Sequence, residues 1–302
     1  MAKPGYKTYS VSVAHVDRLT PSFVRVRFSS AELADIGWDG PDQRIKVVLP
    51  VPDTGFAGFP TGDDWYAQWR LLSEHQRNPI RTYTIRRADR RARELVVDFV
   101  AHGDSGPASR WIASVDVGDS LLVIAPDGSS GGDAGGYEWN PGGATTLLLA
   151  GDETATPAVC SILELLPSDA SGAVFLEVPS QADILQLRAP ERVSVTWLPR
   201  NASAAGTAGY GELLTDAVRA WAAEWCGRQG GVGANRDGLV AISDDDDLWD
   251  VPSTPASSGL YAWLAGEAGA ITGLRRYLVR DLGIDRSRVA FMGYWKLGRA
   301  EN

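Results

Sequence analysis

The chain has 302 residues, of which 44% are apolar and 22% charged, a composition that suits two compact domains with a core each. Its net charge of −9 argues against nucleic acid as a partner. No apolar run approaches the ~20 residues that a membrane-spanning helix needs, and residues 1–10 lack the apolar core of a signal peptide. We therefore expect a cytoplasmic protein without a membrane span, and we expect a monomer.

The residue inventory argues against metal and disulfide chemistry. The two cysteines, Cys160 and Cys226, form no CxxC pair, and the three histidines are far apart in sequence. Neither a disulfide framework nor a protein-held metal is expected. The net charge is −2 over residues 1–140 and −7 over the remainder, so the first part offers the better surroundings for an anionic ligand.

The first part of the chain reads as short strands separated by Gly, Pro and Asp. Apolar or β-branched residues roughly alternate with polar ones in segments 8–20, 23–29, 44–50, 81–88, 93–102 and 118–126. Short alternating strands predict an antiparallel barrel or sandwich. We place this β domain at residues 1–140.

After residue 141 the pattern changes to apolar strands that alternate with helices, which predicts a parallel α/β sheet. Strands are expected at 145–151, 173–179, 193–199, 260–267 and 288–295, helices at 155–166 and 268–282, and a further helix-like segment between 179 and 193. Cys160 lies in the first helix and is expected to be a small buried side chain. Residues 141–302 would form this domain, with an irregular, Gly- and Asp-rich insertion near 226–259.

One predicted barrel strand offers the residue types that a flavin needs. Arg81 can pair with a diphosphate, Tyr83 can stack on an isoalloxazine ring, and Thr84 can form a hydrogen bond near flavin N5. The alternative is an ordinary strand with two alternating faces.

A second feature is a strand followed by a helix start. The strand ends at His102, and a short helix is expected from Pro107, with Ser105 or Gly106 at its N-cap. Free N–H groups at such a start bind anions, which suits a dinucleotide diphosphate. The alternative is a plain helix cap.

Two further motifs follow predicted strands of the α/β domain. Segment 151–158 forms the first strand-to-helix turn, where ligands of open α/β sheets bind, although the G-x-G-x-x-G pattern is absent. Segment 293–298 places two aromatic residues and Lys296 after the last strand, where they line a pocket or pack against the rest of the chain.

In this order and spacing, the motifs RTYTIR, DFVAHGDSGPASRW, LLAGDETATPA, WLAGEAGAITGLRRYL and GYWKLG resemble the siderophore-interacting protein family of ferric-siderophore reductases, within the ferredoxin–NADP reductase superfamily. The resemblance implies an FAD-binding β-barrel followed by a nucleotide-binding α/β domain, with NADPH, NADH or ferredoxin as electron donor. It implies FAD-mediated reduction of Fe(III) in a siderophore, which releases Fe(II). The cofactor-binding candidates are Arg81, Thr82, Tyr83, Thr84, Asp98, His102, Gly106, Pro107, Ala108, Ser109, Asp152, Thr154 and Trp295.

The resemblance also assigns catalytic candidates. Thr84 would lie near the flavin, while Lys46 and Lys296 would guide the ferric siderophore. The chain departs from the family pattern at Asp127, where an arginine is common, and at Gln43-Arg44, where a histidine is common. Less positive charge at residue 127 favours a neutral or hydroxamate siderophore.

Several alternatives stay open. The acceptor could be a quinone, a free flavin or a redox protein, and the chain could also be a non-catalytic siderophore-binding flavoprotein or a flavin-free interaction protein. Arg188 could read a 2′-phosphate or be a surface arginine. The arginine-rich segment 86–93 could be a solvated hairpin or a docking patch. Residues 65–69 could be a siderophore lid or pack over the barrel in a long loop.

Overall fold

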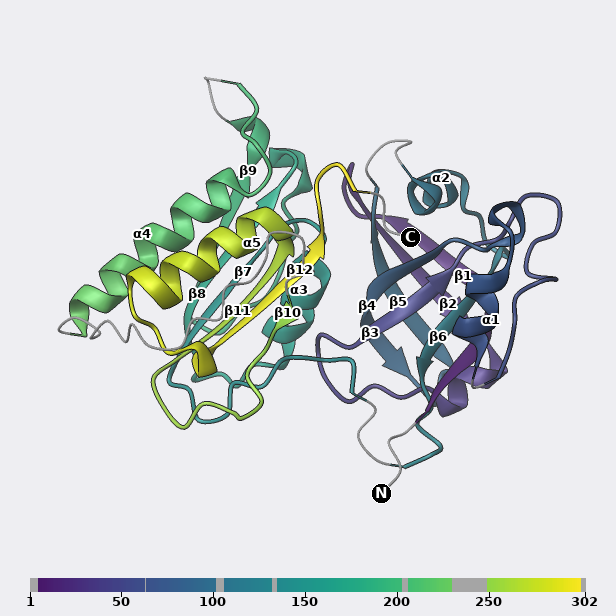
Figure 1. Ribbon diagram of the computed structural model, residues 1–302, viewed down its shortest axis with the longest axis horizontal. Coiled ribbons are helices and arrows are strands. Elements are labelled where there is room, and N and C mark those ends of the chain that lie inside the picture. Colours follow the sequence, from purple (N-terminus) through teal and green to yellow (C-terminus); the bar gives the residue numbers. More distant parts are fainter. Residues whose placement is uncertain are drawn as a thin grey trace. The chain divides into compact units, whose positions relative to one another are not determined.

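The computed structural model describes residues 5–62, 64–101, 106–131, 135–202, 206–229 and 249–299. The chain divides between Tyr137 and Glu138 into two compact units, called here the barrel unit and the α/β unit. The predicted fold class, an antiparallel barrel followed by a parallel α/β domain, is confirmed (Figure 1).

The barrel unit is a closed antiparallel sheet of six strands in the order β1-β2-β5-β4-β3-β6. Its strands are β1 (Tyr6–Arg18), β2 (Phe23–Ser29), β3 (Arg44–Val48), β4 (Ile80–Asp89), β5 (Glu94–Val100) and β6 (Ser120–Pro126). Closure follows from the pairing of β1 with both β2 and β6. No strand of this barrel is left with an unpaired edge, because each has two neighbours.

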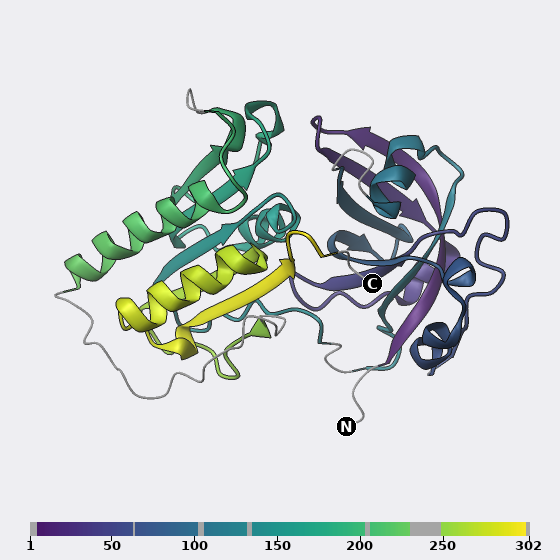
Figure 2. The same ribbon diagram turned by 45° about the horizontal axis from the view of Figure 1, so that its top comes forward.

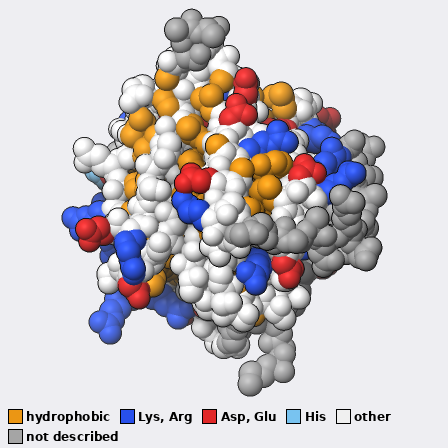
Figure 3. All heavy atoms as spheres, turned by 90° about the vertical axis from the view of Figure 1, so that its left-hand side faces the viewer, with side chains coloured by type: hydrophobic (Ala, Val, Ile, Leu, Met, Phe, Trp, Pro, Cys, Tyr) orange, Lys and Arg blue, Asp and Glu red, His pale blue; other side chains and the backbone are white. Residues whose placement is uncertain are grey.

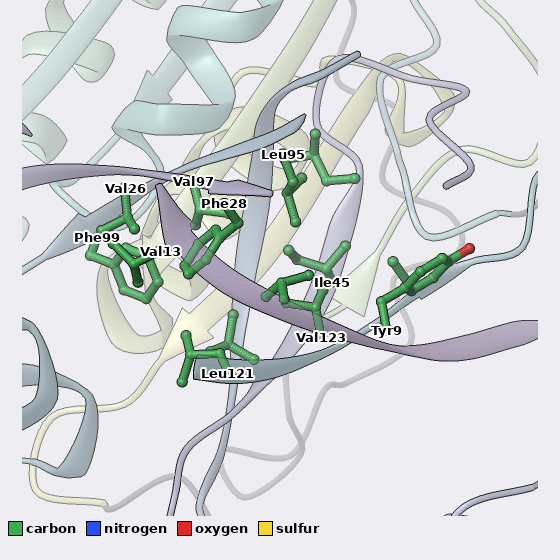
Figure 4. Packing of buried hydrophobic residues seen from close by; sticks show 14 of the residues in the cluster. Tyr9, Val13, Val26, Phe28, Ile45, Leu95, Val97, Phe99, Leu121 and Val123 are labelled. Carbon is green, nitrogen blue, oxygen red and sulfur yellow. The ribbon is translucent and has the colours of Figure 1, made fainter. Parts of the chain in front are cut away.

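Alternation of side chains along these strands fills the barrel interior with apolar groups. Figure 4 shows valine, leucine and phenylalanine side chains from different strands pointing toward one another. Tyr9 lies in the same cluster, and its hydroxyl donates to the carbonyls of Pro126 at 3.0 Å and Asp35 at 3.1 Å. Burial, with the charges of Asp127 and Asp35, raises the pKa of Tyr9, so the phenol stays protonated.

A small second cluster covers part of the outside of the barrel. Residues 65–69 were expected in a long loop, but they lie in helix α1 (Trp65–Leu71), so that expectation is wrong. Trp69 is buried against Val48, Phe59 and Ile124, and its indole N–H donates to the carbonyl of Asn78 at 2.9 Å. Packing over the barrel is therefore the role that the structure shows for Trp69.

The arginine-rich segment forms the predicted hairpin between β4 and β5, but its first member is not solvated. The Arg86 side chain is 10% exposed and lies 3.5 Å from the carboxylate of Asp98. Arg93 adopts a positive φ of 57° in the turn.

The α/β unit is a six-stranded sheet in the order β10-β12-β11-β7-β8-β9. The strands are β7 (Thr146–Gly151), β8 (Ser171–Val178), β9 (Arg192–Pro199), β10 (Trp249–Asp250), β11 (Leu260–Glu267) and β12 (Val289–Trp295), and all pairs are parallel except β10 with β12. Helix α3 (Thr156–Leu165) packs on one face, while α4 (Glu212–Arg228) and α5 (Ala268–Arg275) lie side by side on the other (Figures 1 and 2).

Two expectations for this unit need correction. The helix-like segment expected between 179 and 193 contains only the 3₁₀ turn Gln181–Asp183, whereas the helix predicted over 268–282 is present as α5 (Ala268–Arg275) and a π-helical turn (Arg276–Asp281). The predicted insertion begins too early, because Cys226 is buried in the last turn of α4. Residues 230–248 of that segment lie outside the described residues.

Figure 3 views the α/β unit from the side of α4 and shows hydrophobic side chains scattered among acidic and basic ones. Within the described ranges, no helix combines the length and apolar character needed to cross a bilayer.

Short 3₁₀ turns connect several elements, at Ala31–Asp35, Glu74–Gln76, Gln181–Asp183, Arg200–Ala202 and Arg286–Arg288.

Candidate functional site

The flavin candidates on β4 divide between the two faces of the strand. Arg81 and Tyr83 pair in register with Val47 and Ile45, which lie in the barrel core, so both point inward. Tyr83 is half-buried, and its ring centroid lies 4.5 Å from that of Phe99. Tyr83 thus lies at an end of the barrel core.

Helix α2 (Pro107–Ser114) lies against the same part of the barrel. Trp111 of α2 packs on Phe99 with a centroid distance of 5.6 Å, so one phenylalanine ring contacts both Tyr83 and α2. The helix starts at Pro107 as predicted, after Gly106 at the N-cap. Phe99 therefore links the predicted aromatic residue to the helix that begins with the predicted anion-binding turn.

Among the described residues, no side chain caps the start of α2, and a Cβ built on Gly106 would meet none of their atoms within 4 Å. Ala108 and Ser109, the next predicted contacts, are 8% and 7% exposed. Main-chain N–H groups at the start of a helix suit a phosphate. His102 lies outside the described residues.

Thr82 and Thr84 point to the other face of β4, together with basic side chains of β3. Lys46 Nζ donates to Thr82 Oγ1 at 2.7 Å, and Arg44 pairs in register with Thr84. Thr84 is 5% exposed. Thr84 and Tyr83 are therefore adjacent in sequence but lie on opposite faces of the strand.

Lys46 lies in a groove of about 210 Å³ on the outside of the barrel. The groove combines two cations with aromatic and aliphatic surface, and it is lined by Tyr6, Arg44, Ile45, Lys46, Trp65, Thr82, Ile124 and Gly136. This composition suits a ligand that carries oxygen acceptors on an apolar frame.

Asp98, another cofactor candidate, forms ion pairs with the protein itself. Its carboxylate accepts from Arg25 Nε at 2.7 Å and from Arg25 Nη2 at 2.8 Å, and it lies 3.5 Å from Arg86. The contacts that the structure shows for Asp98 thus tie β5 to β2 and β4.

In the α/β unit, Asp152 is the centre of a hydrogen-bond network at the carboxyl ends of β7, β11 and β12. Its Oδ1 accepts from Thr154 N at 2.9 Å and from Thr154 Oγ1 at 2.5 Å. Its Oδ2 accepts from Trp295 Nε1 at 2.7 Å and from Glu267 N at 2.9 Å. Asp152, Thr154 and Trp295, predicted separately, therefore meet in one cluster.

Burial and the neighbouring charge of Glu153 raise the pKa of Asp152 to about 6, although the hydrogen bonds from Thr154 and Trp295 act in the opposite direction. The approach of Asp152 to β11 requires a glycine at position 266. Gly266 has a φ of +150°, and a Cβ there would lie 2.7 Å from Asp152 Oδ2.

The same cluster holds the two neighbours of Lys296 in the sequence, one through its side chain and one through its backbone. Trp295 is bonded to Asp152, and the main-chain N–H of Leu297 donates to Glu267 Oε1 at 3.2 Å. Glu267 also accepts from Ala270 N at 2.9 Å, at the start of α5. Two carboxylates thus fix the segment that carries this predicted siderophore contact.

Sequence reasoning missed a buried ionic cluster beside Asp152. Arg200, at the end of β9, donates to both oxygens of Glu153 at 2.7 and 2.8 Å and to Glu177 Oε1 at 3.1 Å. All three side chains are almost fully buried. Burial alone would lower the pKa of Arg200, but the hydrogen bonds and charges of Glu153 and Glu177 raise it. The available signal was weak: Glu153 and Arg200 come just after the predicted strands 145–151 and 193–199, and Glu177 is a charged residue inside the predicted strand 173–179.

The comparisons with known proteins identify the family. The model of the siderophore-interacting protein family matches residues 144–298, and that of the siderophore-interacting FAD-binding domain matches residues 12–130. The chain belongs to the siderophore-interacting protein family. The two matches fall in different units, with the FAD-binding domain in the barrel unit.

Relatives of this siderophore-interacting protein match it over nearly its whole length. An uncharacterized protein of Mycobacterium tuberculosis is 31% identical, covering 98% of this chain and 93% of the relative. The ferric vibriobactin reductase ViuB of Vibrio cholerae is 28% identical, covering 95% and 93%.

Solved structures agree. A siderophore utilization protein from T. fusca is 29% identical with a TM-score of 0.70, covering 99% of this chain and 96% of that one. A ferredoxin NADP+ reductase from Neisseria gonorrhoeae has a TM-score of 0.57 at 13% identity, covering 96% and 99%, which shows the shared fold.

The barrel unit of this siderophore-interacting protein offers groups that fit FAD. Arg81 and Tyr83 of β4 carry a guanidinium, which can pair with a diphosphate, and an aromatic ring, while the start of α2 carries main-chain N–H groups that suit a phosphate. The residues present and the matched FAD-binding domain therefore agree.

Proposed function

We propose that this chain is a ferric-siderophore reductase that uses FAD to pass electrons from NAD(P)H or ferredoxin to Fe(III) held by a siderophore. The observation that carries the proposal is 28% identity to a ferric vibriobactin reductase over 95% of the chain. The contacts that link Tyr83 to helix α2 through Phe99 in the barrel unit support the flavin part of it.

The chemistry that bound FAD supplies is the uptake of two electrons and their release one at a time. Arg81 and the N–H groups at the start of α2 would hold its diphosphate, and Tyr83 would contact its ring. Because hard oxygen donors hold Fe(III) more tightly than Fe(II), reduction weakens the siderophore complex without breaking the siderophore. The Fe(II) released would enter iron assimilation in the cytoplasm, the location that we propose for this chain.

Lys46 and Lys296 would attract the ferric complex. Lys46 lies in a groove that also contains Arg44 and the Trp65 ring, so it can present a cation beside apolar surface. Asp127 works against highly anionic complexes, because hydrogen bonds from Ser129 lower the pKa of its carboxyl and keep it ionised. These charges support a neutral or hydroxamate siderophore as substrate.

The proposal is tested with the purified flavoprotein under anaerobic conditions. The flavin is first reduced, a ferric trihydroxamate or a ferric tricatecholate is added, and Fe(II) is followed with a colour-forming chelator. Faster reduction of the trihydroxamate is expected. Faster turnover of a quinone or of free flavin than of either ferric complex would favour another acceptor, and bound flavin that no donor reduces would favour a non-catalytic binding protein.

Two sets of variants separate the two halves of the proposal. Replacing Arg81 and Tyr83 with Ala should remove FAD, whereas Lys46→Ala and Lys296→Ala should retain FAD and weaken ferric-siderophore reduction. Arg87→Ala is the matched control, because Arg87 is an exposed cation of the barrel unit outside the groove. Full flavin content in the first pair, or equal kinetics of the lysine variants and the control, would contradict the assignment.

A further inference from the structure

The parallel sheet of the α/β unit has a defined ligand edge. Strand β7 comes first in the chain, β8 and β9 follow on one side of it, and β11 and β12 lie on the other side. Open α/β sheets bind ligands beyond the carboxyl ends of the strands at such a reversal. In dinucleotide-binding sheets the adenosine ribose lies near the end of the second strand, where an acidic residue favours NAD and a nearby arginine accommodates the 2′-phosphate of NADP.

Glu177 occupies that position in this chain, close to the end of β8. It is fully buried, and its two oxygens accept the main-chain N–H groups of Gly211 at 2.8 Å and Leu214 at 3.0 Å. These groups belong to the N-terminus of α4, the element whose free N–H groups could otherwise hold a phosphate. A carboxylate of the protein therefore already fills this anion-binding position.

The cation beside Glu177 is Arg200, and it already forms ion pairs within the protein. Arg200 is the one basic residue in segments 179–183 and 200–212, which follow β8 and β9 in the sequence. It binds Glu153 and Glu177, and its guanidinium lies 4.4 Å from the centre of the Tyr210 ring. Turning Arg200 toward a phosphate would leave two buried carboxylates without a cation, which is strongly unfavourable.

Arg188, the other arginine considered for a 2′-phosphate, lies elsewhere in the unit. It is exposed and lines a pocket with Leu163, Glu164 and Leu166, at the C-terminal end of α3. Because α3 starts at the carboxyl edge of the sheet and runs away from it, Arg188 is at the opposite end of this helix from the ligand edge.

We propose that Glu177, with Arg200 locked between it and Glu153, makes this chain select NADH over NADPH as its electron donor. The inference rests on the proposed function. The 2′-phosphate would bring about two further negative charges to an edge that carries Asp152, Glu153, Glu177 and Glu267, where Arg200 is already paired with two of these carboxylates. Each NADH gives up a hydride, and its two electrons reduce two Fe(III) to two Fe(II), leaving NAD⁺ and one proton.

The test compares the two nucleotides as reductants of the flavin in the full-length flavoprotein, under anaerobic conditions. We expect kcat/KM for NADH to exceed that for NADPH by about tenfold or more. Calorimetry adds a readout that does not depend on turnover, in which ADP should bind more tightly than adenosine 2′,5′-bisphosphate. Equal or better use of NADPH, or tighter binding of the bisphosphate, would overturn the inference.

Glu177→Gln removes one negative charge and keeps an oxygen acceptor for α4, while Glu224→Gln removes an exposed charge from the same helix as a control. The ratio of kcat/KM for NADPH to kcat/KM for NADH should rise several-fold in Glu177→Gln and stay unchanged in Glu224→Gln. An unchanged ratio in a folded Glu177→Gln protein would count against the role of Glu177, and the wild-type comparison decides the preference even if that variant fails to fold.

The outcomes also separate this inference from the proposed function. If neither nucleotide reduces the flavin but dithionite-reduced protein still reduces ferric siderophores, the donor inference fails and the proposed function stands. If the protein prefers NADH but transfers electrons to no ferric siderophore, the donor inference stands and the proposed function fails.

Discussion

Replacing Arg200 with methionine tests how the buried ionic cluster is balanced. The variant loses three charge-assisted hydrogen bonds, of 2.7, 2.8 and 3.1 Å, and leaves two carboxylates buried without a cation. Breaking a buried pair on one side costs about 3–5 kcal/mol of unfolding free energy. With a urea m-value of about 2 kcal/mol/M, the unfolding midpoint should fall by about 2 M.

The assay is urea unfolding followed by far-UV circular dichroism, with two comparison proteins. Arg228→Met breaks an exposed ion pair with Glu224 and should change the unfolding free energy by about 0.5 kcal/mol or less. A triple variant that adds Glu153→Gln and Glu177→Gln removes the unpaired charges and should recover part of the loss. A triple variant no more stable than Arg200→Met alone would refute the reasoning that uncompensated charge causes the loss.

Three further predictions concern single side chains. The pKa of Asp152 is raised to about 6 from 3.8, so the folded state takes up a proton more readily than the unfolded state. As the pH falls from 7 to 4, the unfolding free energy of the wild type should therefore rise by about 2 kcal/mol relative to that of Asp152→Asn, measured by urea unfolding of both proteins. A difference that does not change with pH would argue against the shift. Gly266→Ala should lower the unfolding free energy by about 2 kcal/mol or more, because the new Cβ meets Asp152. Gly273→Ala in α5, where the new Cβ meets nothing among the described residues within 4 Å, should raise it by about 0.5–1 kcal/mol. Equal thermal unfolding midpoints of the two variants would contradict this prediction. Tyr9→Phe removes a buried hydroxyl that bonds two carbonyls and should destabilise the barrel by about 1 kcal/mol in the same assay, and no change would mean that the carbonyls find other donors.

The fold could be predicted because its signals are local. Alternation in segments such as 23–29 and apolar runs such as 145–151 reflect the burial of one face or of both faces, and the structure has strands at both places. Helix α4 was missed, because only a narrow line of residues faces the core: Leu214, Val218, Ala222 and Cys226. A four-residue spacing among polar neighbours is a weak helical signal.

The arrangement of the site was less accessible to sequence reasoning. Asp152 and Trp295 were both candidates, but their hydrogen bond joins positions 143 residues apart, and no local pattern encodes that pairing. Arg200 was missed because arginine is almost always exposed unless it is paired, and its two partners lie 47 and 23 residues earlier. The division of Tyr83 and Thr84 between two faces follows from strand geometry and could have been stated from the sequence.

The place of β12 within its sheet has a consequence for synthesis. Strand β6 completes the barrel by pairing with β1 and β3, so this unit has all its strands once residue 126 has left the ribosome. The other sheet contains β12 as an interior strand between β10 and β11, and it lacks that partner until residue 295 has been made. Domains fold as units during translation, and distant pairings form slowly. The nascent chain should therefore carry a completed barrel while β11 is still without its partner β12. Chaperones would be needed chiefly while the edge of β11 is unpaired.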